Sequence, residues 1–253
     1  MSGMPAAPQQ AAPVPLVPGL WDLPLGSVHA YLLADGDTPD APLALIDTGF
    51  PGSAPAILGA IGALGRQPED VRWIVATHLH VDHTGSLAEL KRATGAAVMM
   101  HPADAAMVAE GKGARVMHPA PTPESAAFVA QMNASERRME PCATDRLLAD
   151  GDELPVAGGV RVVHVPGHAA GQVALLWPRH GGVLVAADAL GNRGGRLGWS
   201  VGYEDLDRGI ASVERLAGLT FEAAVFGHGD PIVGGADGRF REAVKDTFRA
   251  AAG

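Results

Sequence analysis

Short apolar runs alternate with turn-forming residues along the chain, and their spacing predicts a succession of strands and helices. A β-prone run on each side of the turn-like segment 35–40 predicts an early hairpin. A later short apolar run leads directly into a cluster of histidines. The first half is predicted to hold strands at 28–34, 43–47, 73–76 and 96–100, and helices at 54–64, 87–93 and 102–110.

The segment 111–145 interrupts this pattern because prolines punctuate it, and only 125–132 has helical spacing. We expect it to be an insertion near the active site. The second half is predicted to hold strands at 160–165, 173–177, 183–187 and 223–226, and helices at 206–216 and 240–250. Elements in this order predict two sheets packed face to face with helices outside, or an ordinary α/β layered fold.

The composition suits one globular domain without a nucleic-acid partner. The chain has 253 residues, 47% of them hydrophobic and 19% charged, which is enough to bury a substantial core. Its formal net charge is −9, and no run of lysine and arginine is long enough to follow a phosphate backbone. We therefore expect the partner to be a small-molecule substrate.

The N-terminal segment, the apolar runs and the single cysteine bear on the cellular location of the protein. Residues 1–18 lack the basic start and the apolar stretch of a secretory signal, so we expect a flexible tail before a domain at 19–253. Polar residues, glycine or proline interrupt every apolar run before it could span a bilayer. Cys142 stands alone, which excludes an internal disulfide and a cysteine-built metal site. These features predict a cytoplasmic protein without membrane association.

The strongest chemical signal is the segment His78-Leu79-His80-Val81-Asp82-His83, which holds four potential metal ligands directly after an apolar strand. In an extended segment, His78 and His80 would project from one face because they alternate with Leu79. Asp82 and His83 are adjacent and would point in different directions. This arrangement suits a second metal beside the first.

Three further candidate ligands follow predicted strands. His168 comes after the strand 160–165, Asp188 after 183–187 and His228 after 223–226. A lone histidine is more often structural than a ligand, but strand ends are favoured positions for functional groups. Four clustered groups together with three at strand ends therefore predict a metal site rather than an incidental cluster.

Taken in order, these pieces resemble the metallo-β-lactamase fold superfamily. The matching motifs are 77–85, Gly167-His168, Asp188, Gly227-His228-Gly229 and the early Asp47-Thr48-Gly49. The resemblance implies an αββα sandwich, in which two mixed β-sheets are flanked by helices and the metals lie in a cleft at one edge. It covers about 28–234.

The resemblance also implies a ligand assignment for two divalent metal ions per chain. It places one ion on His78, His80 and His168, the other on Asp82, His83 and His228, and Asp188 between both. Zinc is the first choice because imidazole and carboxylate are its ordinary ligands, although iron and manganese accept the same set. Asp47 either holds a ligand or its loop in place, or is only a turn residue.

Two such ions imply a hydrolytic mechanism. They lower the pKa of a shared water from ~15.7 to near 7 and polarise the scissile bond, so that a metal-bridging hydroxide is the nucleophile. Asp82 is the expected catalytic residue, which orients the hydroxide and moves its proton. We therefore predict a zinc-dependent binuclear hydrolase that cleaves a small ester, thioester or lactone.

The complete ligand set resembles the glyoxalase II and lactonase branches more than true β-lactamases, which usually lack the aspartate ligand. The stretch 188–196 nevertheless lacks the cysteine motif of glyoxalase II and the nearby tyrosine of quorum-signal lactonases. One alternative is a mononuclear-iron persulfide dioxygenase, which is disfavoured because His83 and His228 are both present. Two others are a phosphodiesterase that acts on a small phosphodiester and a non-catalytic binding protein. Substrate contacts of His118 and Tyr203 stay open.

Overall fold

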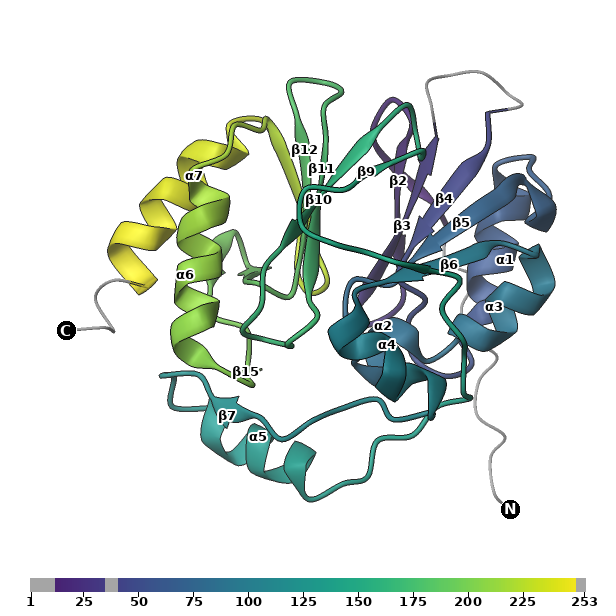
Figure 1. Cartoon of the computed structure of the whole chain (residues 1–253). Coiled ribbons are helices and arrows are strands. Elements are labelled where there is room, and N and C mark those ends of the chain that lie inside the picture. Colours follow the sequence, from purple (N-terminus) through teal and green to yellow (C-terminus); the bar gives the residue numbers. More distant parts are fainter. Residues whose placement is uncertain (1–11, 35–40, 249–253) are drawn as a thin grey trace, which may run out of the picture.

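Two β-sheets lie face to face at the centre of the molecule, and helices cover their outer faces (Figure 1). The structure is a computed structural model that describes residues 12–34 and 41–248. The sequence-based expectation of an αββα sandwich of two mixed sheets is confirmed. Of the two folds considered, the chain therefore forms the two-sheet sandwich and not the single-sheet α/β fold.

The first sheet has seven strands in the order β1-β2-β3-β4-β5-β6-β8. Pairing is antiparallel from β1 to β4 and parallel from β4 to β8. Its strands are β1 (Val14–Val17), β2 (Leu20–Pro24), β3 (His29–Ala34), β4 (Leu43–Ile46), β5 (Val71–Val75), β6 (Ala97–Met100) and β8 (Arg146–Leu147).

The second sheet has six strands in the order β17-β16-β12-β11-β10-β9, with β12 and β16 parallel. These are β9 (Glu153–Leu154), β10 (Val160–His164), β11 (Val173–Trp177), β12 (Val183–Ala187), β16 (Ala223–Phe226) and β17 (Ile232–Val233). Two small ribbons pair β13 (Gly191–Arg193) with β14 (Arg196–Gly198), and β7 (His118–Pro119) with β15 (Gly202–Tyr203).

Helices flank both sheets (Figure 1). Beside the first sheet lie α1 (Ala54–Ala63), the 3₁₀ turn η1 (Pro68–Asp70), α3 (Leu87–Thr94) and α4 (Pro102–Ala109). Beside the second lie α6 (Leu206–Ala217), α7 (Ala236–Ala243) and the π-helical turn η2 (Val244–Phe248). The short α2 (Val81–Thr84) follows β5, and α5 (Ser125–Asn133) lies beyond one end of both sheets in Figure 1. None of these helices is long and apolar enough to cross a membrane.

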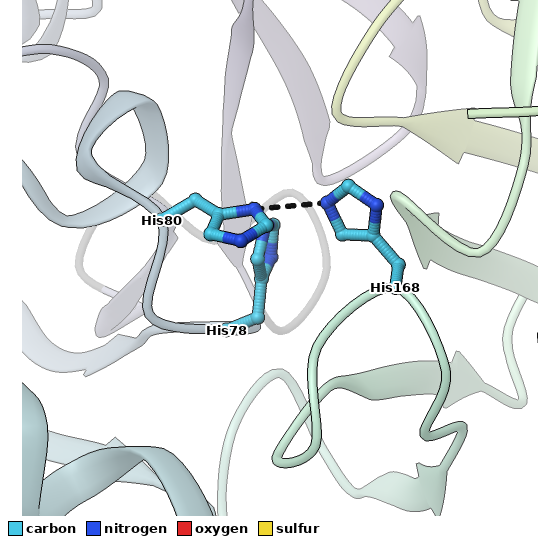
Figure 2. Close-up of side chains that lie close together, drawn as sticks. All are labelled: His78, His80 and His168. Atoms are coloured by element: carbon cyan, nitrogen blue, oxygen red, sulfur yellow. Dashed lines mark hydrogen bonds between the residues drawn. The ribbon is translucent and has the colours of Figure 1, made fainter. Parts of the chain in front are cut away.

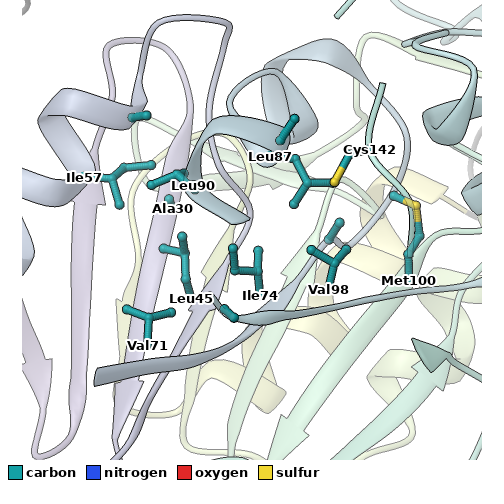
Figure 3. Close-up of a cluster of buried hydrophobic side chains, with 14 of the residues drawn as sticks. Ala30, Leu45, Ile57, Val71, Ile74, Leu87, Leu90, Val98, Met100 and Cys142 are labelled. Atoms are coloured by element: carbon teal, nitrogen blue, oxygen red, sulfur yellow. The ribbon is translucent and has the colours of Figure 1, made fainter. Parts of the chain in front are cut away.

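Three buried apolar clusters fill the interfaces of the sandwich. Alternate residues of β3 separate cleanly: Leu32 packs toward α1 and α3, whereas Leu33 packs between the sheets. On β12, Val185 likewise faces the other sheet and Leu184 faces α6 and α7. Figure 3 shows the cluster under α1 and α3, to which Leu45 and Ile74 contribute. The alternation with a period of two therefore gives each strand two buried faces.

The two sheets are also joined by a polar contact. The buried hydroxyl of Tyr31 on β3 donates to the Phe226 carbonyl on β16 at 2.7 Å.

Replacing Tyr31 with phenylalanine is expected to lower the free energy of unfolding by about 1–3 kcal/mol, because a buried acceptor loses its donor. Urea denaturation measures this loss. Ser135→Ala, which removes an exposed hydroxyl, is the control, and an equal loss in both variants would contradict the prediction.

The structure corrects the sequence-based elements at the two ends of the chain. Residues 14–17, expected in the flexible tail, form the edge strand β1, where Pro15 is tolerated because an edge strand has one unpaired side. The last helix begins at Ala236 and not at Phe240, and its expected end at 250 lies outside the described residues. The turn expected at 35–40 and most of the tail also lie outside them.

Candidate metal centre

Seven candidate ligands meet at one end of the sandwich because each follows or lies near the end of a strand. The loop after β5 carries His78 and His80, and α2 carries Asp82 and His83. The ends of β10, β12 and β16 lead to the other three ligands, which are His168, Asp188 and His228. Both sheets therefore contribute to one site, and the structure brings together all seven residues that the sequence singled out.

Three imidazoles form the first group (Figure 2). Nδ1 of His80 lies 3.1 Å from Nε2 of His78 and 2.9 Å from Nε2 of His168. Two nitrogens that bind one tetrahedral zinc at 2.0–2.1 Å lie about 3.3 Å apart. The spacing of these three nitrogens therefore fits one cation at their centre.

The second group holds both carboxylates. Nε2 of His228 lies 3.2 Å from Oδ2 of Asp82 and 3.2 Å from Oδ2 of Asp188. Nε2 of His83 lies 3.5 Å from Oδ1 of Asp188, and the other Asp188 oxygen lies 3.5 Å from Nε2 of His168. Asp188 is thus in reach of both groups.

Hydrogen bonds on the far side of the rings fix their orientation. Nδ1 of His168 donates to the Gly202 carbonyl at 2.8 Å, and Nδ1 of His228 donates to the Ser27 carbonyl at 2.6 Å. Because a carbonyl oxygen can only accept, each Nδ1 carries a proton, and Nε2 is the ring nitrogen that faces the cluster. These tautomers suit metal ligation.

Three buried polar atoms inside the cluster have no hydrogen-bond partner. They are Nε2 of His80, Nε2 of His83 and Oδ1 of Asp188, and the last two face each other. Buried polar atoms are normally satisfied, so an unpaired nitrogen and an unpaired carboxylate oxygen that face each other indicate a missing positive ligand. The donor set therefore fits divalent cations.

The electrostatics of the two groups differ. Burial lowers the pKa of His80 to about 3, which keeps the imidazole neutral as ligation requires. The Asp188 carboxylate raises the pKa of His228 to about 10. Although burial opposes ionisation, His228 and His83 hold the pKa of Asp188 well below its usual range. The second group therefore attracts positive charge, which a proton or a divalent cation can supply.

Asp47 holds this site from behind. Its carboxylate accepts hydrogen bonds from the Thr77 backbone and hydroxyl at 2.8 Å each, and from Nδ1 of His83 at 2.9 Å. Its own φ is +59°, a conformation that costs free energy for a residue with a side chain. Of the two roles considered for Asp47, these contacts match the one that positions a ligand and its loop.

Gly227 is required by the same packing. A Cβ atom at this position would lie 1.9 Å from Oδ1 of Asp188 and 2.6 Å from Cε1 of His83. The backbone next to His228 therefore has to pass directly against two ligands, and only glycine leaves room.

A cavity of about 540 Å³ opens onto the cluster. Its wall includes the candidate ligands His80, Asp82, His168, Asp188 and His228. The insertion 111–145 contributes Glu124, Ser125, Phe128, Met132 and Arg137, while Arg193 and Val201 come from 191–203. Residues of the segment 111–145 thus form one side of this cavity.

Tyr203 and His118 do not line this cavity. The buried Tyr203 hydroxyl accepts from the Ser200 backbone at 3.1 Å and lies 3.4 Å from the Ala189 carbonyl, so its hydrogen bonds are internal. His118 is exposed on β7 and pairs with Tyr203 through the backbone. Both residues therefore have structural positions.

Asp104 is a buried carboxylate that the sequence analysis did not single out. It accepts from the backbone of Leu79 at 3.1 Å, from the backbone of Gly171 at 3.1 Å and from Nη1 of Arg115 at 2.7 Å. Arg115 also pairs with Glu204 at 3.1 Å, and Glu204 accepts from the Ala170 backbone. One carboxylate thus ties the loop of His78 and His80 to the loop of His168. In the sequence, the role of Asp104 could have been suggested only by its position in the first turn of α4, directly after β6.

Comparison with known proteins agrees with this geometry. The family model described as the metallo-β-lactamase superfamily matches residues 23–228. A hydroxyacylglutathione hydrolase from Anaeromyxobacter dehalogenans (strain 2CP-C) is 42% identical over 163 residues, which are 64% of this chain and 46% of that protein. The match thus spans about half the length of that relative.

Two further proteins cover more of the chain. An N-acyl homoserine lactonase from Bacillus sp is 29% identical over 203 residues, which are 69% of this chain and 67% of that protein. The solved metallo-β-lactamase MIM-1 from Novosphingobium pentaromativorans has a TM-score of 0.69 at 22% identity and covers 95% of this chain and 89% of its own. At that identity, the structural likeness shows the fold alone.

Proposed function

Because the chain belongs to the metallo-β-lactamase superfamily of metallo-hydrolases, we propose that it uses two divalent cations to cleave a small ester, thioester or lactone. The observation that carries this proposal is the gathering of five imidazoles and two carboxylates into three overlapping groups, with the donor atoms of each group within 4.8 Å of one another. We propose zinc for both positions, since zinc favours nitrogen and carboxylate ligands.

The proposed ligands form two sets, one for each cation. His78, His80 and His168 would hold one cation, and Asp82, His83 and His228 the other, with Asp188 shared. When bound, such cations lower the pKa of water and polarise a carbonyl oxygen.

The protein's own residues orient the reaction. Asp82 lines the cavity with a side chain that is 20% exposed, so its carboxylate can orient the attacking water and accept its proton. The water oxygen bonds to the carbonyl carbon, the bond to the leaving oxygen or sulfur breaks, and Asp82 returns the proton to that leaving atom. The hydrogen bonds from Asp47, Gly202 and Ser27 keep the imidazoles in place meanwhile.

The names of two relatives support an ester-type substrate. A hydroxyacylglutathione hydrolase and an N-acyl homoserine lactonase both share sequence with this chain. Asp188 and the other proposed ligands are the residues of this chain that suit such a reaction. The cytoplasmic location and the small-molecule substrate stay predictions from the sequence.

Metal addition is expected to stabilise the protein at a stoichiometry of two per chain. Zinc at a hundredfold excess over its Kd stabilises a one-site protein by about 2.7 kcal/mol, so the thermal midpoint should rise measurably. Differential scanning calorimetry and elemental analysis check both quantities. His78→Ala should bind less metal, whereas the exposed His118→Ala should match the natural protein. One iron per chain would contradict the proposal.

Turnover tests the reaction itself. The metal-loaded protein is expected to hydrolyse at least one substrate in a panel of simple esters, thioesters and lactones, and to lose that activity when a chelator removes the metal. A loaded protein that is inactive across the panel would overturn the proposed function.

A further inference from the structure

The cavity beside the metal residues has one apolar side and two arginines, and this combination points to its substrate. We propose that the substrate is an ester or thioester that combines an apolar chain or ring with a carboxylate. This inference rests on the proposed hydrolytic function and narrows it. The residues that would read the two features are Phe50, Phe128 and Met132 for the apolar part, and Arg137 and Arg193 for the carboxylate.

The apolar part of the wall is unusual because its aromatic side chains are open to solvent. Phe50 is 38% exposed and Phe128 is 48% exposed, although both are large apolar residues. Phe128 lies on α5 with Met132 one turn later, and both line the cavity. Exposed apolar surface gathered in a concave site gains free energy when an apolar group covers it. These side chains therefore favour an apolar substituent on the substrate.

The wall also holds two arginines without ion pairs. Within the part of the chain that the structure describes, neither Arg137 nor Arg193 pairs with a carboxylate, whereas the neighbouring Arg138 pairs with Glu136. Nε of Arg137 is moreover buried without a hydrogen-bond partner. A guanidinium stays charged and suits bidentate binding of a carboxylate. In a chain with a net charge of −9, these two cations make the cavity a local anion site.

Hydrogen bonds connect the segments that carry the two arginines to the segments that carry the proposed ligands. Asn192, next to Arg193, receives a hydrogen bond at 2.9 Å from the Asp230 backbone, and its side chain donates to the Asp230 carbonyl at 2.7 Å. This holds β13 against the loop of His228. The Arg137 carbonyl accepts from Gly113, whose own carbonyl accepts from Val81 at the start of α2.

Among the residues that the structure describes, Glu124 is the one further charged side chain of the cavity wall outside the proposed ligands. Two arginines outweigh it, so the part of the wall outside the proposed ligands carries a net positive charge. The volume of about 540 Å³ also lies within the range that small-molecule sites occupy. The cavity therefore suits a small amphiphilic anion.

Two matched pairs of thioesters test the proposal. One pair joins a hexanoyl group to 3-mercaptopropionate or to its amide, and the other joins hexanethiol to succinate or to succinamate. The metal-loaded protein is expected to prefer the carboxylate in at least one pair by about 10- to 100-fold in kcat/KM, because a hydrogen-bonded charge is lost in the amide. The pair that shows the preference reports which side of the scissile bond faces the arginines.

Variants assign the preference to its residues. Arg137→Met or Arg193→Met should remove most of the carboxylate preference through KM, whereas Arg138→Met should keep it. Phe128→Ala should reduce the preference for hexanoyl over acetyl, whereas Leu147→Ala, exposed on β8, should not. Hydrolysis with equal kcat/KM for acid and amide in both pairs would overturn this inference alone. No hydrolysis of any ester, thioester or lactone would instead overturn the proposed function.

Discussion

Replacing Asp82 with asparagine is expected to lower kcat/KM by about 10²- to 10⁴-fold, the range that a positioned proton acceptor contributes. The amide keeps the shape of the side chain but cannot take a proton from the attacking water. Asp82 lies on the cavity wall and 3.2 Å from Nε2 of His228, so the substitution changes the site and not the apolar core. The unfolding free energy of the protein should change far less than its activity.

Steady-state kinetics on the metal-loaded variant, with metal content measured in the same preparation, checks this prediction. Asp207→Asn changes an exposed carboxylate on α6 and serves as the matched control. Full turnover in Asp82→Asn would show that another group moves the proton. Lost turnover together with lost metal would assign Asp82 to ligation first.

Replacing Asp104 with alanine is expected to lower the free energy of unfolding by about 2–6 kcal/mol, because two buried backbone N–H groups lose their acceptor at about 1–3 kcal/mol each. The carboxylate is fully buried and accepts from Leu79, Gly171 and Arg115. Its loss would leave two backbone donors without their acceptor, while Arg115 would keep its pair with Glu204. Because the two backbone donors belong to the loops of His78, His80 and His168, metal affinity should fall as well.

Urea denaturation with and without zinc measures both effects. Glu136→Ala removes one partner of the exposed pair with Arg138 and is expected to cost less than about 1 kcal/mol. Should Asp104→Ala fail to fold, Asp104→Asn keeps the shape of the side chain and is expected to show a smaller loss in the same direction. A loss in Asp104→Ala no larger than that of Glu136→Ala would contradict the role of Asp104.

Much of the fold could be predicted because its long strands and helices carry strong local patterns. The strand at 183–187 and the helix at 206–216 match β12 and α6 nearly residue for residue. Strands of two or three residues, such as β7 and β13, are too short to show a periodicity. β1 and β2 were missed because prolines and polar residues interrupt their alternation.

The sequence by itself determined the family and the candidate metal ligands of this protein: these are the run from His78 to His83 and the strand-end residues His168, Asp188 and His228. Only the tertiary structure decided how these residues are held and what they face. Asp104 contacts loops 25 and 67 residues away, and the cavity joins 111–145 to 191–203. Such contacts depend on how two sheets pack, and no local periodicity encodes that packing. The unpaired arginines and exposed aromatics of the cavity became visible for the same reason, because partners and exposure exist only in the folded chain.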